Sequence, residues 1–201
     1  MAKLSRERAK QSSRDQPHQP ADALIAIVLS VTTAECFINE LAELVRLDYE
    51  GISRQFLSNE KLEFLEKFDL EEKGRGRILK KYCVAALALS GDELIKDKNP
   101  YQDFKLLVDV RNCIIHLRPL QRLVPDVGFP QPEPILRLAK LGLTFKPKWR
   151  DYSWVDAIST VEMAEWSCET ARNMIVDIHN RLPHGKDSIS YSILADGHLP
   201  R

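Results

Sequence analysis

Apolar residues recur at alternating intervals of three and four along most of this chain, the spacing of one face of an α-helix. Between residues 22 and 48 the stripe is continuous and consists of Leu24, Ile27, Val31, Ala34, Ile38, Leu41 and Val45. The same pattern predicts shorter helices over residues 59–68 and 77–89, the second ended by Gly91. Because no segment alternates with a period of two, the sequence predicts no β-strand.

The helix predicted over residues 100–117 has the clearest ends. Asn99 suits the N-cap position, Pro100 the first helical position, and Gln102 can complete a capping box. Pro119 closes the helix, because proline lacks a backbone N–H and disfavours helical geometry at the residue before it.

A proline-rich excursion and one more long helix follow. Six of the 11 prolines lie between residues 119 and 155, namely Pro119, Pro125, Pro130, Pro132, Pro134 and Pro147. We expect one short helix there, over residues 134–141 and ended by Gly142. The three-four pattern then predicts a last helix over residues 154–182, which Pro183 stops.

These elements predict an all-α protein, a bundle of four to five main helices. Residues 1–20 have the composition of a flexible basic tail, residues 21–182 of a single helical domain with the 119–155 insertion, and residues 183–201 of a second tail. A chain of 201 residues with 44% hydrophobic content can bury one core, whereas two domains would be cramped.

The composition narrows the classes of function. The formal net charge is +0, so no overall field attracts nucleic acid, and any RNA contact needs a local patch. The four cysteines lie far apart and form no CxxC pair: Cys36, Cys83, Cys113 and Cys168. We therefore expect no metal site and no cofactor, and we interpret the cysteines as small core residues of a reducing compartment.

The N-terminus has no apolar signal core, and the longest apolar run, residues 23–29, is too short to cross a bilayer. We expect a soluble, cytoplasmic protein that does not contact a membrane.

Residues 111–116, Arg-Asn-Cys-Ile-Ile-His, are the strongest candidate for chemistry. Arg111 is permanently cationic, and His116 exchanges protons near neutral pH. An RNA 2′-hydroxyl attacks its own phosphate when one group moves protons and another stabilises the charge on phosphorus. At about 100° per residue, Asn112 and His116 share the polar side of the helix, whereas Arg111 falls inside its apolar arc.

An arginine in an apolar arc has two explanations, because a buried unpaired charge is costly. In the first explanation, Arg111 pairs with a carboxylate of another helix, for which Glu35 is a candidate. Alternatively, the arc borders a cleft or a second subunit into which Arg111 points.

The segment NPYQDFKLLVDVRNCIIHLRP, residues 99–119, resembles the motif helix of the HEPN superfamily. The signature of that superfamily is an Arg, usually followed by Asn, and then a His with four to six residues between the Arg and the His, and here four residues separate Arg111 from His116. Residues 34–41, AECFINEL, are similar to HEPN first-helix sequences with an E-x-x-x-N pattern.

The resemblance implies a metal-independent endoribonuclease of a toxin–antitoxin, defence or stress-response system. It implies a homodimer in which two motifs face each other across one composite site, with RNA as substrate and a cognate antitoxin or operon partner. Arg111 and His116 would be the catalytic pair, Asn112 would orient them, and Glu35 and Asn39 would support them. Other HEPN members are non-catalytic scaffolds or bind nucleotides, so an interaction or nucleotide-binding module is the alternative.

The densest cluster of basic residues consists of Lys73, Arg75, Arg77, Lys80 and Lys81. Three of them lie near a predicted helix N-terminus, where the helix dipole disfavours cations. The cluster is therefore a candidate RNA contact, and the other interpretation is a solvated loop and first helical turn.

Overall fold

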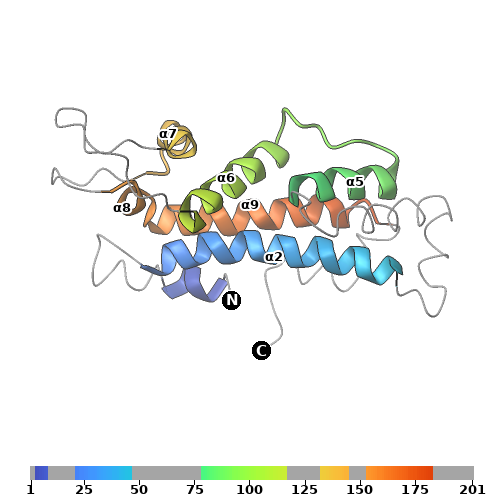
Figure 1. Ribbon diagram of the computed structural model, residues 1–201, viewed down its shortest axis with the longest axis horizontal. Coiled ribbons are helices and arrows are strands. Elements are labelled where there is room, and N and C mark those ends of the chain that lie inside the picture. The colour runs from blue at the N-terminus through green and yellow to red at the C-terminus, as the bar shows by residue number, and fades with distance from the viewer. Residues whose placement is uncertain (1–2, 9–20, 47–77, 117–131, 145–152, 183–201) are drawn as a thin grey trace. The chain divides into compact units, whose positions relative to one another are not determined.

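A computed structural model describes residues 3–8, 21–46, 78–116, 132–144 and 153–182. Within these ranges the regular structure is helical, without a β-strand, so the all-α class is confirmed for the described part of the chain (Figure 1). The main helices are α2 (Ala21–Arg46), α5 (Ile78–Ser90), α6 (Tyr101–Ile115), α7 (Glu133–Lys140), α8 (Trp154–Ile158) and α9 (Val161–His179). The helix predicted over residues 59–68 lies outside the described residues, as does the tail 183–201.

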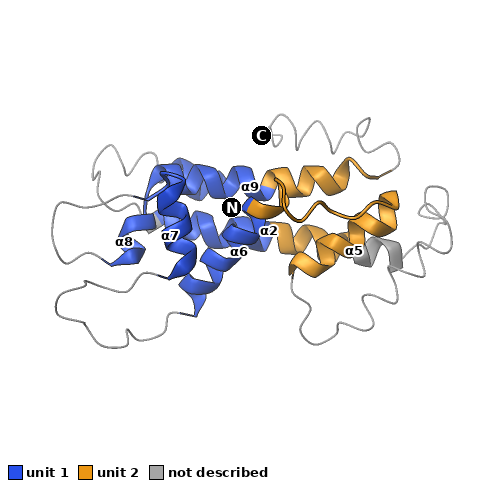
Figure 2. Ribbon diagram, turned by 90° about the horizontal axis from the view of Figure 1, so that it is seen from above, with its two compact units in different colours: residues 1–33, 103–171 blue, residues 34–102, 172–201 orange. Residues whose placement is uncertain are grey.

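The chain divides into two compact units, which Figure 2 shows in different colours. Unit 1 comprises residues 1–33 and 103–171, and unit 2 comprises residues 34–102 and 172–201. The helices α2 and α9 therefore contribute one part of their length to each unit. Each unit has buried residues of its own and is described separately below.

Unit 1 is organised where the beginning of α2 packs against the beginning of α9. Ala23 and Ala26 of α2 and Ala164 of α9 form one fully buried cluster, and these small side chains let the two backbones approach closely. Further along, Oγ of Ser30 donates a hydrogen bond of 3.5 Å to Sγ of Cys168. The largest fully buried side chains elsewhere in the unit are Phe104, Leu106, Leu107, Ile135, Leu138, Ile158 and Met163.

Unit 2 is organised around Tyr82 of α5. Its side chain is fully buried, and its hydroxyl donates a hydrogen bond of 2.9 Å to the carbonyl of Ala34 on α2. Burial raises the pKa of Tyr82 far above its ordinary value, so the phenol stays neutral. The next residue, Cys83, is hydrogen-bonded to the side chain of Tyr101, and burial raises the pKa of both groups.

The helix α2 also satisfies the length and composition of a membrane-spanning helix. Its stretch Asp22–Leu41 has 20 residues and a mean hydropathy of 1.6. A core helix of a bundle passes the same test, and α2 has a buried face that consists of Ala23, Ala26, Ile27, Ser30, Val31, Ala34 and Ile38.

The last helix differs from its prediction. Instead of one helix over residues 154–182, α8 ends at Ile158 and α9 begins at Val161. Between them, Oγ of Ser159 donates to the carbonyl of Val155 at 2.8 Å, and Oγ1 of Thr160 accepts from the backbone N–H of Met163 at 3.0 Å. These local side-chain bonds compete with the helical ladder and give α9 a separate N-terminus.

The predicted capping box at the start of α6 is wrong. In a capping box the side-chain oxygen of Gln102 would accept from the backbone N–H of Asn99, but the helix begins at Tyr101 and Nε2 of Gln102 donates to the carbonyl of Lys96. The backbone N–H of Gln102 donates to the carbonyl of Lys98 at 3.1 Å. The carbonyls of the preceding segment therefore accept from the backbone N–H and from the side-chain amide of Gln102.

The N-terminal segment also differs from the expected flexible tail. Residues 3–8 are helical, and Ser5 is only 6% exposed. Lys, Leu, Arg and Glu, which make up most of this segment, are all strong helix formers.

The interpretation of all four cysteines as core residues is wrong for Cys36. Its thiol is exposed, whereas those of Cys83, Cys113 and Cys168 are half-buried. Cys36 follows the buried Ala34 by two positions and precedes the buried Ile38 by two, so it lies on the opposite side of α2.

Candidate functional site

The Arg-Asn…His motif occupies the C-terminal end of α6, and its residues belong to unit 1. The preceding turns of α6 are held in the protein by the buried residues Phe104, Leu106, Leu107, Val108 and Val110. From Arg111 onward no residue of α6 is buried: residues 111–114 are half-buried, and Ile115 and His116 are exposed. The motif therefore lies where the helix emerges from the core.

His116 closes the last turn of this helix. Its backbone N–H donates a hydrogen bond of 2.9 Å to the carbonyl of Asn112, so the helical geometry continues to the histidine. Residues four apart lie one above the other on a helix, which places the imidazole one turn beyond the carboxamide of Asn112. Both side chains are therefore accessible on the same side of α6.

Arg111 lies in the continuation of the apolar arc but is only half-buried. Its Nε atom is buried and forms no hydrogen bond of its own, although the side chain takes part in another interaction. Its neighbour on the arc, Ile115, is 50% exposed. The arc that faces the core at Phe104 and Leu107 thus becomes a partly open surface at the end of the helix, where it carries both a cation and an apolar side chain.

The helix α7 provides a charged group whose electrostatic effect reaches the motif. Burial raises the pKa of the Cys113 thiol, and the carboxylates of Asp109 and of Glu133, the first residue of α7, raise it further. Cys113 lies directly after Asn112 and three positions before His116. A carboxylate from a second helix is therefore within electrostatic range of the motif.

The position of Glu133 follows from how α7 forms. Pro132 precedes the helix, Ile135 and Leu138 bury one face of it, and Gly142 follows with φ 73°, which favours glycine. This helix confirms the short one predicted over residues 134–141. The carboxylate of Glu133 lies 3.9 Å from Nε of Arg137, one turn later.

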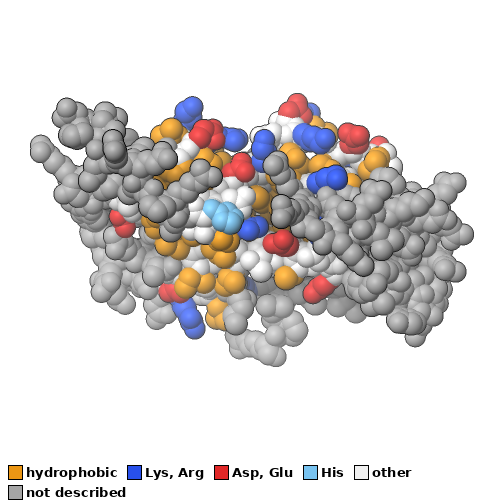
Figure 3. Space-filling view, viewed as in Figure 1, with side chains coloured by type: hydrophobic (Ala, Val, Ile, Leu, Met, Phe, Trp, Pro, Cys, Tyr) orange, Lys and Arg blue, Asp and Glu red, His pale blue; other side chains and the backbone are white. Residues whose placement is uncertain are grey.

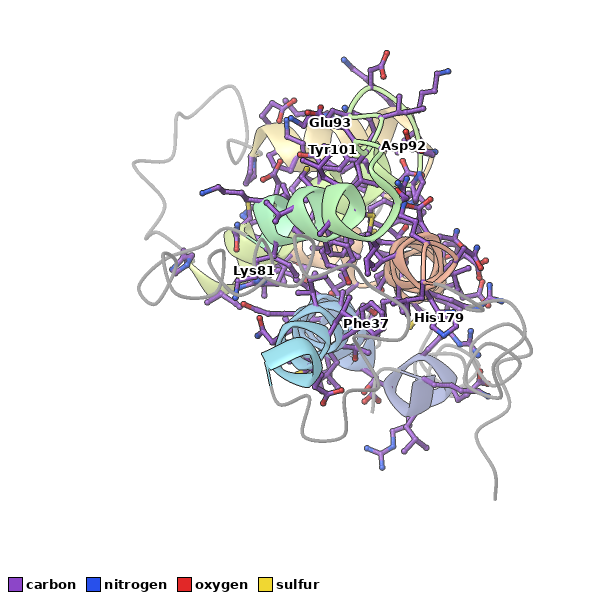
Figure 4. The ribbon with its side chains drawn as sticks, turned by 90° about the vertical axis from the view of Figure 1, so that its right-hand side faces the viewer. Phe37, Lys81, Asp92, Glu93, Tyr101 and His179 are labelled. Atoms are coloured by element: carbon purple, nitrogen blue, oxygen red, sulfur yellow. The ribbon has the colours of Figure 1, made fainter. Side chains whose placement is uncertain are left out.

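The supporting residues Glu35 and Asn39 belong to unit 2, so their relation to the motif stays a prediction. Asn39 has a different partner: its Oδ1 accepts a hydrogen bond of 2.8 Å from Nζ of Lys81 on α5. The structure thus brings together a residue predicted to support the catalytic pair and a residue predicted to contact RNA. Lys81 is labelled on α5 in Figure 4.

Of the basic cluster, Lys80 is exposed and Lys81 is half-buried. Lys73, Arg75 and Arg77 lie outside the described residues. On the described surface shown in Figure 3, basic and acidic side chains are mixed, as the net charge of +0 leads one to expect. Within the described residues no group of three or more His, Cys, Asp or Glu side chains is placed to hold a metal ion.

Sequence reasoning missed two polar groups of unit 2. His179, at the end of α9, is only 5% exposed, and burial lowers its pKa. Arg181 connects the end of α9 to the end of α5 through Ser90 and Asp92. Neither carries a sequence signal, since both lie in the last turn of a predicted helix, where His and Arg are common.

Searches against protein-family models, curated proteins and solved structures give no match to this chain. The described helices and the motif at the end of α6 define the protein only as an all-α protein with an Arg-Asn…His motif at the C-terminal end of a helix. The likeness to HEPN proteins rests on the motif and its helical setting.

Proposed function

We propose that this chain is a metal-independent endoribonuclease of the HEPN type, cytoplasmic and part of a toxin–antitoxin, defence or stress-response system. The observation that carries the proposal is the emergence of Arg111, Asn112 and His116 from the core at the end of α6. An imidazole that can move protons and a cation that can stabilise charge on phosphorus, together at one helix end, suit metal-free cleavage of a phosphodiester.

In the proposed reaction the imidazole of His116 takes the proton of the RNA 2′-hydroxyl and returns a proton to the 5′-leaving oxygen. The 2′-oxygen forms a bond to phosphorus while the bond to the 5′-oxygen breaks. Arg111 stabilises the charge on the pentacoordinate phosphate, and Asn112 orients the pair. The products are a 2′,3′-cyclic phosphate and a 5′-hydroxyl, and no metal or cofactor takes part.

A single helix end presents one copy of each group, so the proposal includes a homodimer in which two motifs share one site. The half-exposed Ile115 next to His116 supports this part, because an apolar side chain at the rim gives a second subunit a surface to cover. Arg111 would then contact the phosphate of the substrate.

The test is incubation of the purified chain with mixed RNA in EDTA, followed by analysis of the cleaved ends. We expect cyclic-phosphate ends, and we expect His116→Ala and Arg111→Ala to abolish cleavage. Arg137→Ala, which removes a half-buried arginine of unit 1 outside the motif, is the matched control and should cleave normally. Loss of activity in EDTA, or cleavage by both motif variants, would contradict the mechanism.

The exposed Ile115 also favours a second candidate, a non-catalytic HEPN-like interaction module, with nucleotide binding as its variant. Growth after induced expression distinguishes the two functions. Toxicity that His116→Ala relieves supports the nuclease. Harmless expression together with tight binding of another protein, or saturable nucleotide binding that depends on Arg111, supports the module.

A further inference from the structure

The hydroxyl of Ser90, the last residue of α5, is the acceptor for two separate donors. Nη1 of Arg181 lies 2.8 Å from Oγ of Ser90, and the backbone N–H of Asp92 lies 3.3 Å from it. The hydroxyl itself donates to the carbonyl of Ala86 at 3.0 Å. A cation and a main-chain N–H converging on one oxygen form a small anion-binding arrangement.

The surroundings of Ser90 are open. Ser90 is exposed, and the next residue, Gly91, has φ 79°, which turns the chain away from α5. A Cβ placed on Gly91 would meet nothing within 4 Å. Ser90 therefore lies at an exposed helix end with open space beside the next residue.

Arg181 is held in place and still has donor capacity. Its Nε donates to Oδ2 of Asp177 at 3.1 Å, and its Nη1 also donates to the carbonyl of Asp92 at 3.1 Å. A guanidinium has five N–H donors, and these bonds use only Nε and Nη1. All the groups involved belong to unit 2, and Asp92 is labelled in Figure 4.

We propose that Ser90 is a phosphorylation site and that Arg181 binds the phosphate. Oγ of Ser90 attacks the γ-phosphorus of a nucleoside triphosphate held by a protein kinase. The Oγ–P bond forms, the bond from the γ-phosphorus to the bridging oxygen breaks, and the diphosphate leaves. The hydroxyl proton passes to a base of the kinase. Ser90 is followed by Gly-Asp-Glu, an acidic context that suits a kinase with a basic substrate groove.

The phosphate would change how the end of α5 is held. It adds a charge of about −1.5 to −2 and three acceptor oxygens, and it removes the hydroxyl donor to Ala86. The helix C-terminus and the carboxylates of Asp92 and Glu93 repel it, whereas Arg181 attracts it. Arg181 would therefore donate to the phosphate through Nη1 and Nη2 while Nε stays on Asp177, which strengthens its connection to the segment that leads into α6.

The claim that Arg181 binds the phosphate is tested on the whole chain produced with phosphoserine at position 90. The ³¹P chemical shift of that phosphoserine is followed as a function of pH. We expect the second pKa of the phosphate to lie roughly 0.5–1 unit below its ordinary value of about 6. The Arg181→Gln variant should raise it back, whereas Arg137→Gln should leave it unchanged. The same pKa with and without Arg181 would overturn the assignment of the receptor.

The claim that Ser90 accepts phosphate is tested by incubating the folded chain with a nucleoside triphosphate and a serine kinase that prefers acidic residues after the serine. Tandem mass spectrometry then maps the phosphorylated residue. Phosphate should appear at Ser90, should be lost in Ser90→Ala, and should persist in Thr33→Ala, which removes an exposed hydroxyl of α2. Phosphate found only at other residues, or none on the folded chain, would refute Ser90 as an acceptor.

Discussion

Nζ of Lys81 on α5 donates a hydrogen bond of 2.8 Å to Oδ1 of Asn39 on α2, within unit 2. The sequence suggested different tasks for these residues, contact with RNA for Lys81 and support of the catalytic pair for Asn39. Their bond shows that Asn39 fixes the position of a lysine ammonium. It leaves the positive charge of Lys81 in place, because a carboxamide carries no charge.

The first prediction concerns RNA binding by Lys81. In a His116→Ala background, which prevents cleavage in the proposed mechanism, Lys81→Ala should weaken binding of a labelled single-stranded RNA. It should also reduce the slope of log K against log salt concentration by about 1, as expected for one lost phosphate contact. Lys140→Ala, which removes an exposed lysine of α7, is the control. Fluorescence anisotropy at several salt concentrations measures both quantities, and an unchanged slope in Lys81→Ala would remove Lys81 from the RNA-contact residues.

The second prediction concerns the buried hydroxyl of Tyr82. Tyr82→Phe deletes the hydrogen bond to the carbonyl of Ala34 and should lower the free energy of unfolding by about 1 kcal/mol. Tyr82→Ala, which also empties a fully buried site, should cost about 3–5 kcal/mol. Urea denaturation measures both values. Equal stability of the wild type and Tyr82→Phe would mean that the hydroxyl contributes nothing to the packing of α5 on α2.

The third prediction concerns pH. Burial lowers the pKa of His179 in the folded protein, so the unfolded chain binds its proton at a higher pH than the folded chain does. Stability should therefore be unaffected by His179 above the unfolded pKa of about 6.5 and should decrease as the pH falls below it. In His179→Gln the decrease between pH 7 and pH 5 should be smaller. The free energy of unfolding at pH 8, where His179 is neutral in both states, measures the effect of losing the side chain itself. An identical dependence of the free energy of unfolding on pH in the two proteins would contradict the prediction.

The sequence predicted most helix positions because they depend on local signals. The spacing of Ile27, Val31, Ala34 and Ile38 predicted the buried face of α2, and Gly91 and Gly142 ended α5 and α7 with positive φ. The break between α8 and α9 was missed because the apolar stripe passes through it, from Ala157 to Ala164. There the side-chain hydrogen bonds of Ser159 and Thr160 interrupt the helix, and the spacing of apolar residues cannot predict such bonds.

The candidate site was predictable only in part. Helical geometry alone predicts that Asn112 and His116 share one side of α6 and that Arg111 lies on another. The proximity of Glu133 to Cys113, and the bond between Lys81 and Asn39, depend on which helices pack together, and one sequence contains no direct signal for that.

The fourth prediction tests the break between α8 and α9. Thr160→Ala removes the hydroxyl that caps α9 and should lower the free energy of unfolding by about 1 kcal/mol. Thr33→Ala is the matched control, because Oγ1 of Thr33 only donates to the carbonyl of Leu29 within an exposed part of α2. That change should be within about 0.5 kcal/mol of the wild type. Equal effects of the two variants would show that the cap does not stabilise α9.

The fifth prediction separates the two explanations of Arg111. If the half-buried Arg111 faces a cleft or a second subunit, it contributes little to folding, and Arg111→Met should change the free energy of unfolding by less than about 1 kcal/mol. In the proposed nuclease the same variant should lose RNA cleavage, because methionine keeps the apolar contacts of the stem but stabilises no phosphate charge. Denaturation and cleavage assays on one preparation give both values. A loss of stability of about 3–5 kcal/mol would instead identify Arg111 as half of a buried ion pair that holds unit 1 together.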